Sequence, residues 1–219
     1  CRVLFNAFEN IEQISTRLAS IKSGIPLARF IKPHLLTEEE YLDVVNAMHS
    51  LGEYKERLKI VRNASIDRVR ALCDEFKPDI VIWDFLQRFA HRYDLGSHGT
   101  LAHEVGKAVS DLQDMAIDKN AVVFCLSQIR RSVDDYQRSY SKTVEYRPPD
   151  VSELKESGDI ENYADNIFMA WWPWRDTMSD KLNPNDYRIS VQKNKLGPLG
   201  NVSVHLNVET LKISDWKIA

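Results

Sequence analysis

The stretch Arg147-Pro-Pro-Asp-Val-Ser-Glu-Leu-Lys-Glu-Ser-Gly-Asp-Ile-Glu-Asn-Tyr-Ala-Asp165 is polar and lies between two apolar segments of the chain. The first segment, residues 121–127, is a predicted strand that leads into Gln128, and the second, residues 166–172, is another predicted strand. A buried strand with a polar end, followed by a loop, can connect a ligand site at the strand end to that loop. The stretch therefore indicates a sheet with a binding site at its strand ends.

Strands alternate with helices upstream of this stretch. The apolar periodicity predicts strands at 2–8, 80–83 and 121–127 and helices at about 11–21, 38–51, 65–76 and 100–119. Asn10 is the expected N-cap of the first helix, and Thr37 with Glu40 has the form of a capping box. The continuous apolar run Ile80-Val-Ile-Trp83 is typical of a strand buried on both faces. We therefore expect an α/β fold with a mostly parallel sheet flanked by helices.

The last third of the sequence has a different pattern. Residues 186–193, 200–208 and 211–213 are predicted to be consecutive strands, and Gly197-Pro198-Leu199-Gly200 is predicted to form a hairpin turn. We expect these strands to add an antiparallel part at one edge of the sheet.

Composition limits the class of protein. The 219 residues, 43% of them hydrophobic, suffice for one globular domain, and the net charge of -3 offers no overall basic field for nucleic acid. The three cysteines lack metal-ligand spacing, and no apolar run reaches the ~20 residues of a membrane span. We expect a reduced, cytoplasmic location with no membrane partner. The chain opens directly in the apolar run Val3-Leu4-Phe5, from which we expect a single domain, residues 1–219, truncated at its N-terminus.

Three predicted strands end in polar side chains that suit phosphate chemistry. Asp84 follows the run of residues 80–83 and has the form of a Walker B carboxylate, which holds Mg²⁺. Glu9 ends the first strand and could polarise an attacking water, and Gln128 could sense a γ-phosphate. Taken singly, each has an ordinary structural explanation: a turn former, a helix N-terminal acid and a strand-end hydrogen bond. Together, in one parallel sheet, they favour a nucleotide site.

Five segments carry a resemblance to a known family. They are Ala7-Phe8-Glu9-Asn10, Asp84-Phe85-Leu86-Gln87, Leu126-Ser127-Gln128-Ile129-Arg130-Arg131, Lys155-Glu-Ser-Gly-Asp-Ile-Glu-Asn-Tyr-Ala-Asp165 and Lys193-Asn-Lys-Leu-Gly-Pro-Leu-Gly200. In sequence and order they resemble the C-terminal motor domain of bacterial and phage replicative helicases of the DnaB type. The family motifs read Ser-Leu-Glu-Met, Asp-Tyr-Leu-Gln, Leu-Ser-Gln-Leu-Ser-Arg, Arg-Glu-Ser-Gly-Ser-Ile-Glu-Gln-Asp-Ala-Asp and Lys-Gln-Arg-Asn-Gly-Pro-Thr-Gly. The fourth segment is the most specific match.

The resemblance implies a RecA-like domain that couples ATP hydrolysis to movement along single-stranded DNA. Glu9 would activate water, Asp84 would hold Mg²⁺ and Gln128 would link the phosphate to a DNA loop. Lys193 and Lys195 would bind and act on the ATP of a neighbouring subunit. The implied partners are single-stranded DNA, further copies of the chain in a homo-hexamer, and a primase or helicase loader.

Two features depart from the family pattern. The phosphate-binding loop Gly-x-x-x-x-Gly-Lys-[Ser/Thr] occurs nowhere in the 219 residues, although the family places it upstream of residue 1. Lys195 occupies the position of an arginine finger, and lysine lacks the planar fork of arginine. The alternatives are therefore a fragment of a working motor and a relative that binds DNA or assembles rings without catalysis. A recombinase or clock-type ATPase of the RecA class fits the fourth segment less well.

DNA contacts are predicted in two loops. Residues 130–147 carry five basic side chains against three acidic ones, with tyrosines that could stack on bases. The second loop follows Asp84. The basic residues of the two loops that are assigned to DNA are Arg88, Arg92, Arg130, Arg131, Arg138 and Lys142. A polar surface segment is the alternative explanation for both loops.

Overall fold

A computed structural model describes residues 1–93, 100–129, 149–154, 157–177 and 180–215. Their contacts divide the chain into two compact units. The first unit contains residues 1–127 and 209–211, and the second contains residues 128–208 and 212–219.

The first unit is built on a parallel sheet. Its strands are β1 (Val3–Ala7), β2 (Leu58–Arg62), β3 (Ile80–Asp84) and β4 (Val122–Cys125), in the order β2-β1-β3-β4. All three strand pairs are parallel, which confirms the predicted sheet. Its helices are α1 (Ile11–Ser23), α2 (Leu27–Ile31), η1 (Pro33–Leu35), α3 (Glu38–Gly52), α4 (Ile66–Phe76), α5 (Leu86–Ala90) and α6 (Leu101–Asp118).

The helix ends follow from local chemistry. Asn10 accepts a hydrogen bond from the backbone N–H of Glu12 at 3.3 Å, so it is the predicted N-cap of α1. Thr37 and Glu40 form the predicted capping box of α3, with distances of 3.2 and 2.8 Å. Lys77 ends α4 in the left-handed region at φ 49°, a conformation that glycine adopts more easily.

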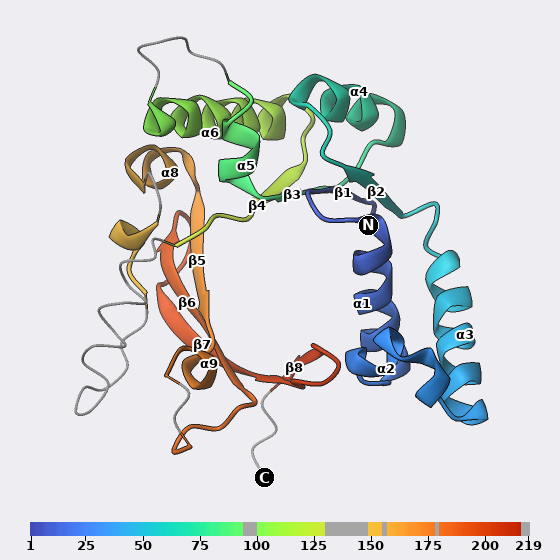
Figure 1. Ribbon diagram of the computed structural model, residues 1–219. Helices are drawn as coiled ribbons and strands as arrows, with labels where there is room; N and C mark the ends of the chain where they lie inside the picture. Colours follow the sequence, from blue (N-terminus) through green and yellow to red (C-terminus); the bar gives the residue numbers. More distant parts are fainter. Residues whose placement is uncertain (94–99, 130–148, 155–156, 178–179, 216–219) are drawn as a thin grey trace. The chain divides into compact units, whose positions relative to one another are not determined.

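One face of the parallel sheet carries the more deeply buried strand side chains. Leu4, Asn6, Val81 and Trp83 alternate along β1 and β3 and are buried, while the side chains between them are half-buried. Figure 1 shows α4, α5 and α6 on one side of the sheet and α1 with α3 on the other. The buried helical side chains are Val69 and Leu72 of α4 and Val105, Ala108, Leu112 and Met115 of α6.

The second unit is an antiparallel sheet. It contains η3 (Val151–Glu153), α8 (Ser157–Tyr163), α9 (Pro173–Thr177) and the strands β5 (Asn166–Trp171), β6 (Asp186–Asn194), β7 (Gly200–Leu206) and β8 (Ile213–Asp215). The strand order is β5-β6-β7-β8, with a register shift between Ile167 and Phe168. The predicted antiparallel C-terminal strands and hairpin are confirmed, but among the described residues they form a sheet of their own and not an addition to the edge of the parallel sheet.

None of the described helices combines the length and the apolar character that a bilayer crossing needs.

Candidate functional site at the strand ends

The strand order creates a crevice at the carboxyl ends of β1 and β3. These strands are neighbours, and Ala7 of β1 is in register with Asp84 of β3. The chain leaves β1 toward β2 on one side and leaves β3 toward β4 on the other. Open α/β sheets bind ligands where neighbouring connections diverge in this way. Asp84 ends β3 and Glu9 follows β1 by two residues, so both lie at this switch point, and the roles predicted for them remain predictions.

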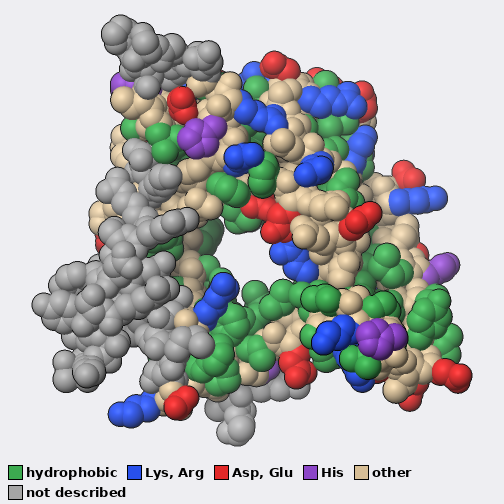
Figure 2. Space-filling view, in the orientation of Figure 1, with side chains coloured by type: hydrophobic (Ala, Val, Ile, Leu, Met, Phe, Trp, Pro, Cys, Tyr) green, Lys and Arg blue, Asp and Glu red, His purple; other side chains and the backbone are tan. Residues whose placement is uncertain are grey.

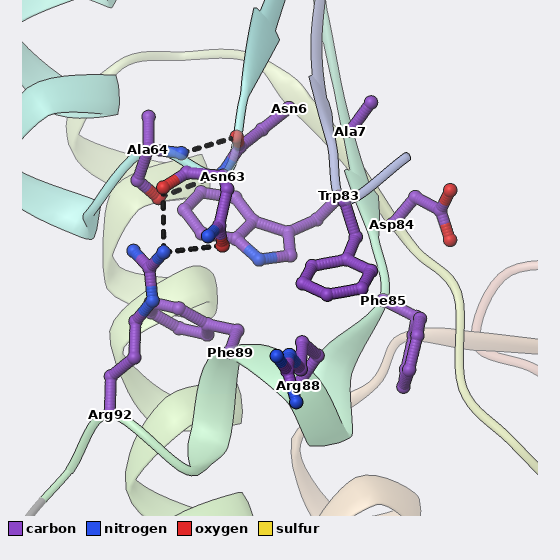
Figure 3. Close-up of a pocket in the computed structure, with 11 residues that line it drawn as sticks. Asn6, Ala7, Asn63, Ala64, Trp83, Asp84, Phe85, Arg88, Phe89 and Arg92 are labelled. Atoms are coloured by element: carbon purple, nitrogen blue, oxygen red, sulfur yellow. Dashed lines mark hydrogen bonds between the residues drawn. The ribbon is translucent and has the colours of Figure 1, made fainter. Parts of the chain in front are cut away.

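Asp84 is a half-buried carboxylate at the end of β3. Burial raises its pKa above the ordinary value, and the positive charge of Arg17 opposes that shift. In Figure 3 the Asp84 carboxylate points away from the indole of Trp83. A carboxylate that lacks full solvation gains from a nearby cation, which is the environment that a hard metal ion requires.

Glu9 lies in the turn between β1 and α1 and forms an ion pair with Arg17 of α1. Both side chains keep about two fifths of their surface exposed, at 43% for Glu9 and 38% for Arg17. One guanidinium therefore interacts with both carboxylates of the crevice. Arg17 could not be predicted from the sequence, because only the folded helix brings it back to the strand ends.

Aromatic rings and a second arginine lie beside these carboxylates. The rings of Phe8 and Phe85 meet edge to face at 6.1 Å, and the guanidinium of Arg88 lies 4.4 Å from the Phe8 ring centroid. These three side chains line a small pocket together with Asp84 (Figure 3). Arg88 is exposed, so its predicted DNA contact remains open to test.

The turn between β2 and α4 is fixed to the same strand ends. The amide of Asn6, which is only 3% exposed, accepts from Ala64 N–H at 2.9 Å and donates to Ala64 C=O at 3.0 Å. Arg92 donates to the backbone oxygen of Asn63 at 2.6 Å and also to its side-chain oxygen (Figure 3). Arg92 was predicted to contact DNA, and here its guanidinium holds this turn.

Gln128, the third predicted site residue, is the first residue of the second unit and is exposed. It follows the end of β4 by three residues. The hydroxyl oxygen of the preceding Ser127 accepts a hydrogen bond from Gln87 of α5 at 2.8 Å. The predicted role of Gln128 is not tested by this arrangement and remains a prediction.

Lys193 lies near the end of β6, and Lys195 lies in the turn between β6 and β7. The Lys193 ammonium donates to the carbonyl oxygen of Glu161 at 2.5 Å, and the Lys195 ammonium donates to the Asp165 carboxylate at 2.6 Å. Both acceptors belong to the polar stretch of residues 147–165. The structure therefore brings two of the sequence segments together within the second unit.

The predicted DNA contacts Arg130, Arg131, Arg138 and Lys142 lie outside the described residues. On the face drawn in Figure 2, basic and acidic side chains of the described part are interspersed. That distribution agrees with the net charge of -3.

A divalent cation and a nucleotide fit this site in part. No group of three acidic, histidine or cysteine side chains that could hold a metal was found among the described residues. Mg²⁺ in nucleotide sites needs only one or two protein carboxylates, because waters and phosphates supply its other ligands. Asp84 suits that role, whereas the sequence contains no glycine-rich phosphate loop.

Comparisons with known proteins agree on the family. The model of the DnaB-like helicase C terminal domain matches residues 2–215. A probable replicative DNA helicase of Trieres chinensis is 25% identical over 98% of this chain and 46% of its own length. A probable plasmid replicative DNA helicase of Chlamydia trachomatis is 27% identical over 97% of this chain and 42% of its own length. The chain thus spans less than half of these curated relatives.

Solved structures agree on the fold. One solved ATPase domain superposes with a TM-score of 0.81 at 22% identity, covering 99% of this chain and 75% of that one. A DnaB-like replicative helicase, described with its interactions with primase, gives a TM-score of 0.83 at 21% identity, covering 99% of this chain and 51% of that one. The predicted RecA-like α/β fold is confirmed.

Proposed function

The chain belongs to the DnaB-like helicase C-terminal domain family, and we propose that it is the motor part of a replicative DNA helicase. It would couple nucleotide hydrolysis at subunit interfaces to movement along single-stranded DNA and to unwinding of the duplex. The observation that carries this proposal is the pair of carboxylates, Glu9 and Asp84, at the switch point of the parallel sheet. We further propose a cytoplasmic location.

The roles of the two carboxylates follow from their surroundings. Asp84 would hold Mg²⁺ through water, and the ion would neutralise charge on the phosphates of ATP. Glu9 would accept a proton from the attacking water. Arg17 would keep the Glu9 carboxylate at the strand ends until water and nucleotide arrive.

A phosphate-binding loop must complete this site, and we propose that sequence upstream of Cys1 supplies it. An open strand edge supports the proposal. β4 is one of the two outer strands of the parallel sheet, and the side chains of Val122, Phe124 and, just after the strand, Leu126 are about half exposed, at 55%, 47% and 50%. Parallel sheets ordinarily have covered faces, and an outer strand has a row of backbone groups that can pair, so a further strand could pack beside β4.

Subunit assembly would complete the motor. In a homo-hexamer, Lys193 and Lys195 would bind and act on the nucleotide of the neighbouring subunit, and Gln128 would connect the phosphate to the DNA loop. Arg88, Arg92 and the basic residues of 130–142 would contact the phosphate backbone of single-stranded DNA. A primase or a helicase loader would be a further partner.

The test uses the full-length natural polypeptide. We expect ATP hydrolysis that requires Mg²⁺ and increases with single-stranded DNA, and we expect Glu9→Gln to reduce the rate by about 10²–10⁴-fold, the usual contribution of a general base. Glu12→Gln, in the first turn of α1, is the matched control and should leave the rate unchanged. Salt-sensitive DNA binding without any effect of nucleotide would instead support a non-catalytic DNA-binding or ring-assembly protein.

A further inference from the structure

The β6–β7 hairpin is held to the stretch of residues 157–165 by three polar contacts. The Lys193 ammonium binds the backbone oxygen of Glu161, in the last turn of α8. The Lys195 ammonium binds the Asp165 carboxylate at 2.6 Å, and the Lys195 backbone N–H donates to the Asp165 backbone oxygen at 3.1 Å. Asp165 thus contacts Lys195 through both its backbone and its side chain.

The hairpin backbone is braced independently of these lysines. The Asn194 side chain accepts from Leu196 N–H at 3.3 Å and donates to the Pro198 carbonyl at 3.1 Å. A Cβ atom on Gly197 would lie 2.7 Å from the Asn194 amide nitrogen, so this position needs glycine while Asn194 holds the turn. The side chain of Lys195, which is 67% exposed, does not take part in this bracing and contacts Asp165 instead.

The ammonium group of Lys195 can donate to more than one acceptor. The lysine ammonium carries three N–H donors, and the Asp165 carboxylate engages the ammonium of Lys195 through one contact, so further donors remain for another anion. Lysine has a flexible four-carbon stem and lacks the preorganised fork of arginine. A carboxylate that fixes the direction of the ammonium reduces the ordering needed when a second anion binds.

We propose that Asp165 is a positioning residue for Lys195: it aligns the ammonium so that the remaining N–H groups reach the phosphoryl oxygens of a nucleotide bound by a neighbouring subunit. The inference rests on the proposed function of Lys195. Both side chains are more than half exposed, so the pair adds little to folding stability. We therefore expect loss of the pair to change the rate of hydrolysis and to leave folding stability nearly unchanged.

A double-mutant cycle on the full-length protein tests the proposal. The variants are Asp165→Asn, Lys195→Met and their combination, and kcat and KM for ATP are measured with single-stranded DNA present. Asp165→Asn should lower kcat by about threefold to tenfold, the effect of one disordered long side chain, with KM nearly unchanged. In the Lys195→Met background the same change should have no further effect. Asp165→Glu should restore part of the rate.

Asp215→Asn is the matched control. It removes one exposed carboxylate of the same unit on β8, which pairs with Val204 of β7, away from the turn between β6 and β7. It should leave kcat unchanged.

The outcomes separate this inference from the proposed function. A wild-type protein without ATP hydrolysis overturns the proposed function and this inference with it. An active wild type with an unaffected Lys195→Met variant overturns the role of Lys195. Equal losses from Asp165→Asn with and without Lys195 indicate a merely structural role for Asp165, and no loss at all also overturns the proposal.

Discussion

Replacing Asn6 by alanine should loosen the turn that borders the carboxylate crevice. Asn6 is 3% exposed, and its amide makes both hydrogen bonds with the backbone of Ala64, at 2.9 and 3.0 Å. Alanine removes both partners and leaves a half-buried N–H and C=O without their hydrogen bonds. Two lost bonds of about 1 kcal/mol each, with part of the desolvation cost, reduce the free energy of local opening by about 2–3 kcal/mol.

Hydrogen exchange of the Ala64 amide measures this opening directly. A loss of about 2–3 kcal/mol corresponds to a protection factor lower by roughly 30-fold to 150-fold, because each ~1.4 kcal/mol is tenfold. Asn10→Ala is the control: it removes another asparagine hydrogen bond of the unit, the exposed N-cap of α1, and should leave Ala64 protection unchanged. Equal protection of Ala64 in the wild type and in Asn6→Ala would refute the reasoning.

Three further changes have defined expected results. Asp84→Asn should raise the midpoint of urea unfolding at neutral pH, because burial makes the ionised Asp84 carboxylate costly. The gain should fade as the pH falls through the raised pKa of Asp84 toward the ordinary 3.8, so an equal gain at neutral pH and near pH 3.8 would contradict this. Lys77→Gly should stabilise the chain by about 0.5–1 kcal/mol in urea unfolding, since glycine adopts φ 49° without strain. A loss of stability would show that contacts of the lysine side chain outweigh this strain. Thr37→Ala should destabilise α3 by about 1 kcal/mol in urea unfolding, because it opens the capping box. Thr16→Ala is the control: the Thr16 hydroxyl donates to the Glu12 carbonyl within α1, and its loss should change the unfolding curve less.

Local features of the fold and its parallel sheet were predictable from the sequence, whereas particular long-range pairings were not. The caps at Asn10 and Thr37 depend on residues two or three positions away, so their chemistry is visible in the chain. β2 was missed because Leu58-Lys-Ile-Val-Arg62 is short and partly charged, and its partner β1 lies more than 50 residues earlier. Burial against distant residues decides such a strand, and local propensity does not.

In the candidate site, too, some residues could be named from the sequence and others could not. Glu9 and Asp84 could be named because each ends an apolar run, and a parallel sheet gathers such ends at one edge. Arg17 could not be named, since its ion pair with Glu9 depends on the path of α1. The contacts of Lys193 and Lys195 depend on the register of β5 and β6, which shifts between Ile167 and Phe168 and leaves no signal in the sequence.

The division of the chain into two units also determines where the chain can be cut or truncated to obtain one unit by itself. The backbone passes between the units three times, after residues 127, 208 and 211. The short return segment Glu209–Leu211 belongs to the first unit, where the Glu209 carbonyl accepts from Leu27 N–H at 2.8 Å and Thr210 is buried. A protease cut after Ser127 would therefore not release a complete first unit. A gene fragment ending there would lack the segment Glu209–Leu211, so boundaries for dissecting the protein should follow this interleaving and not the linear sequence.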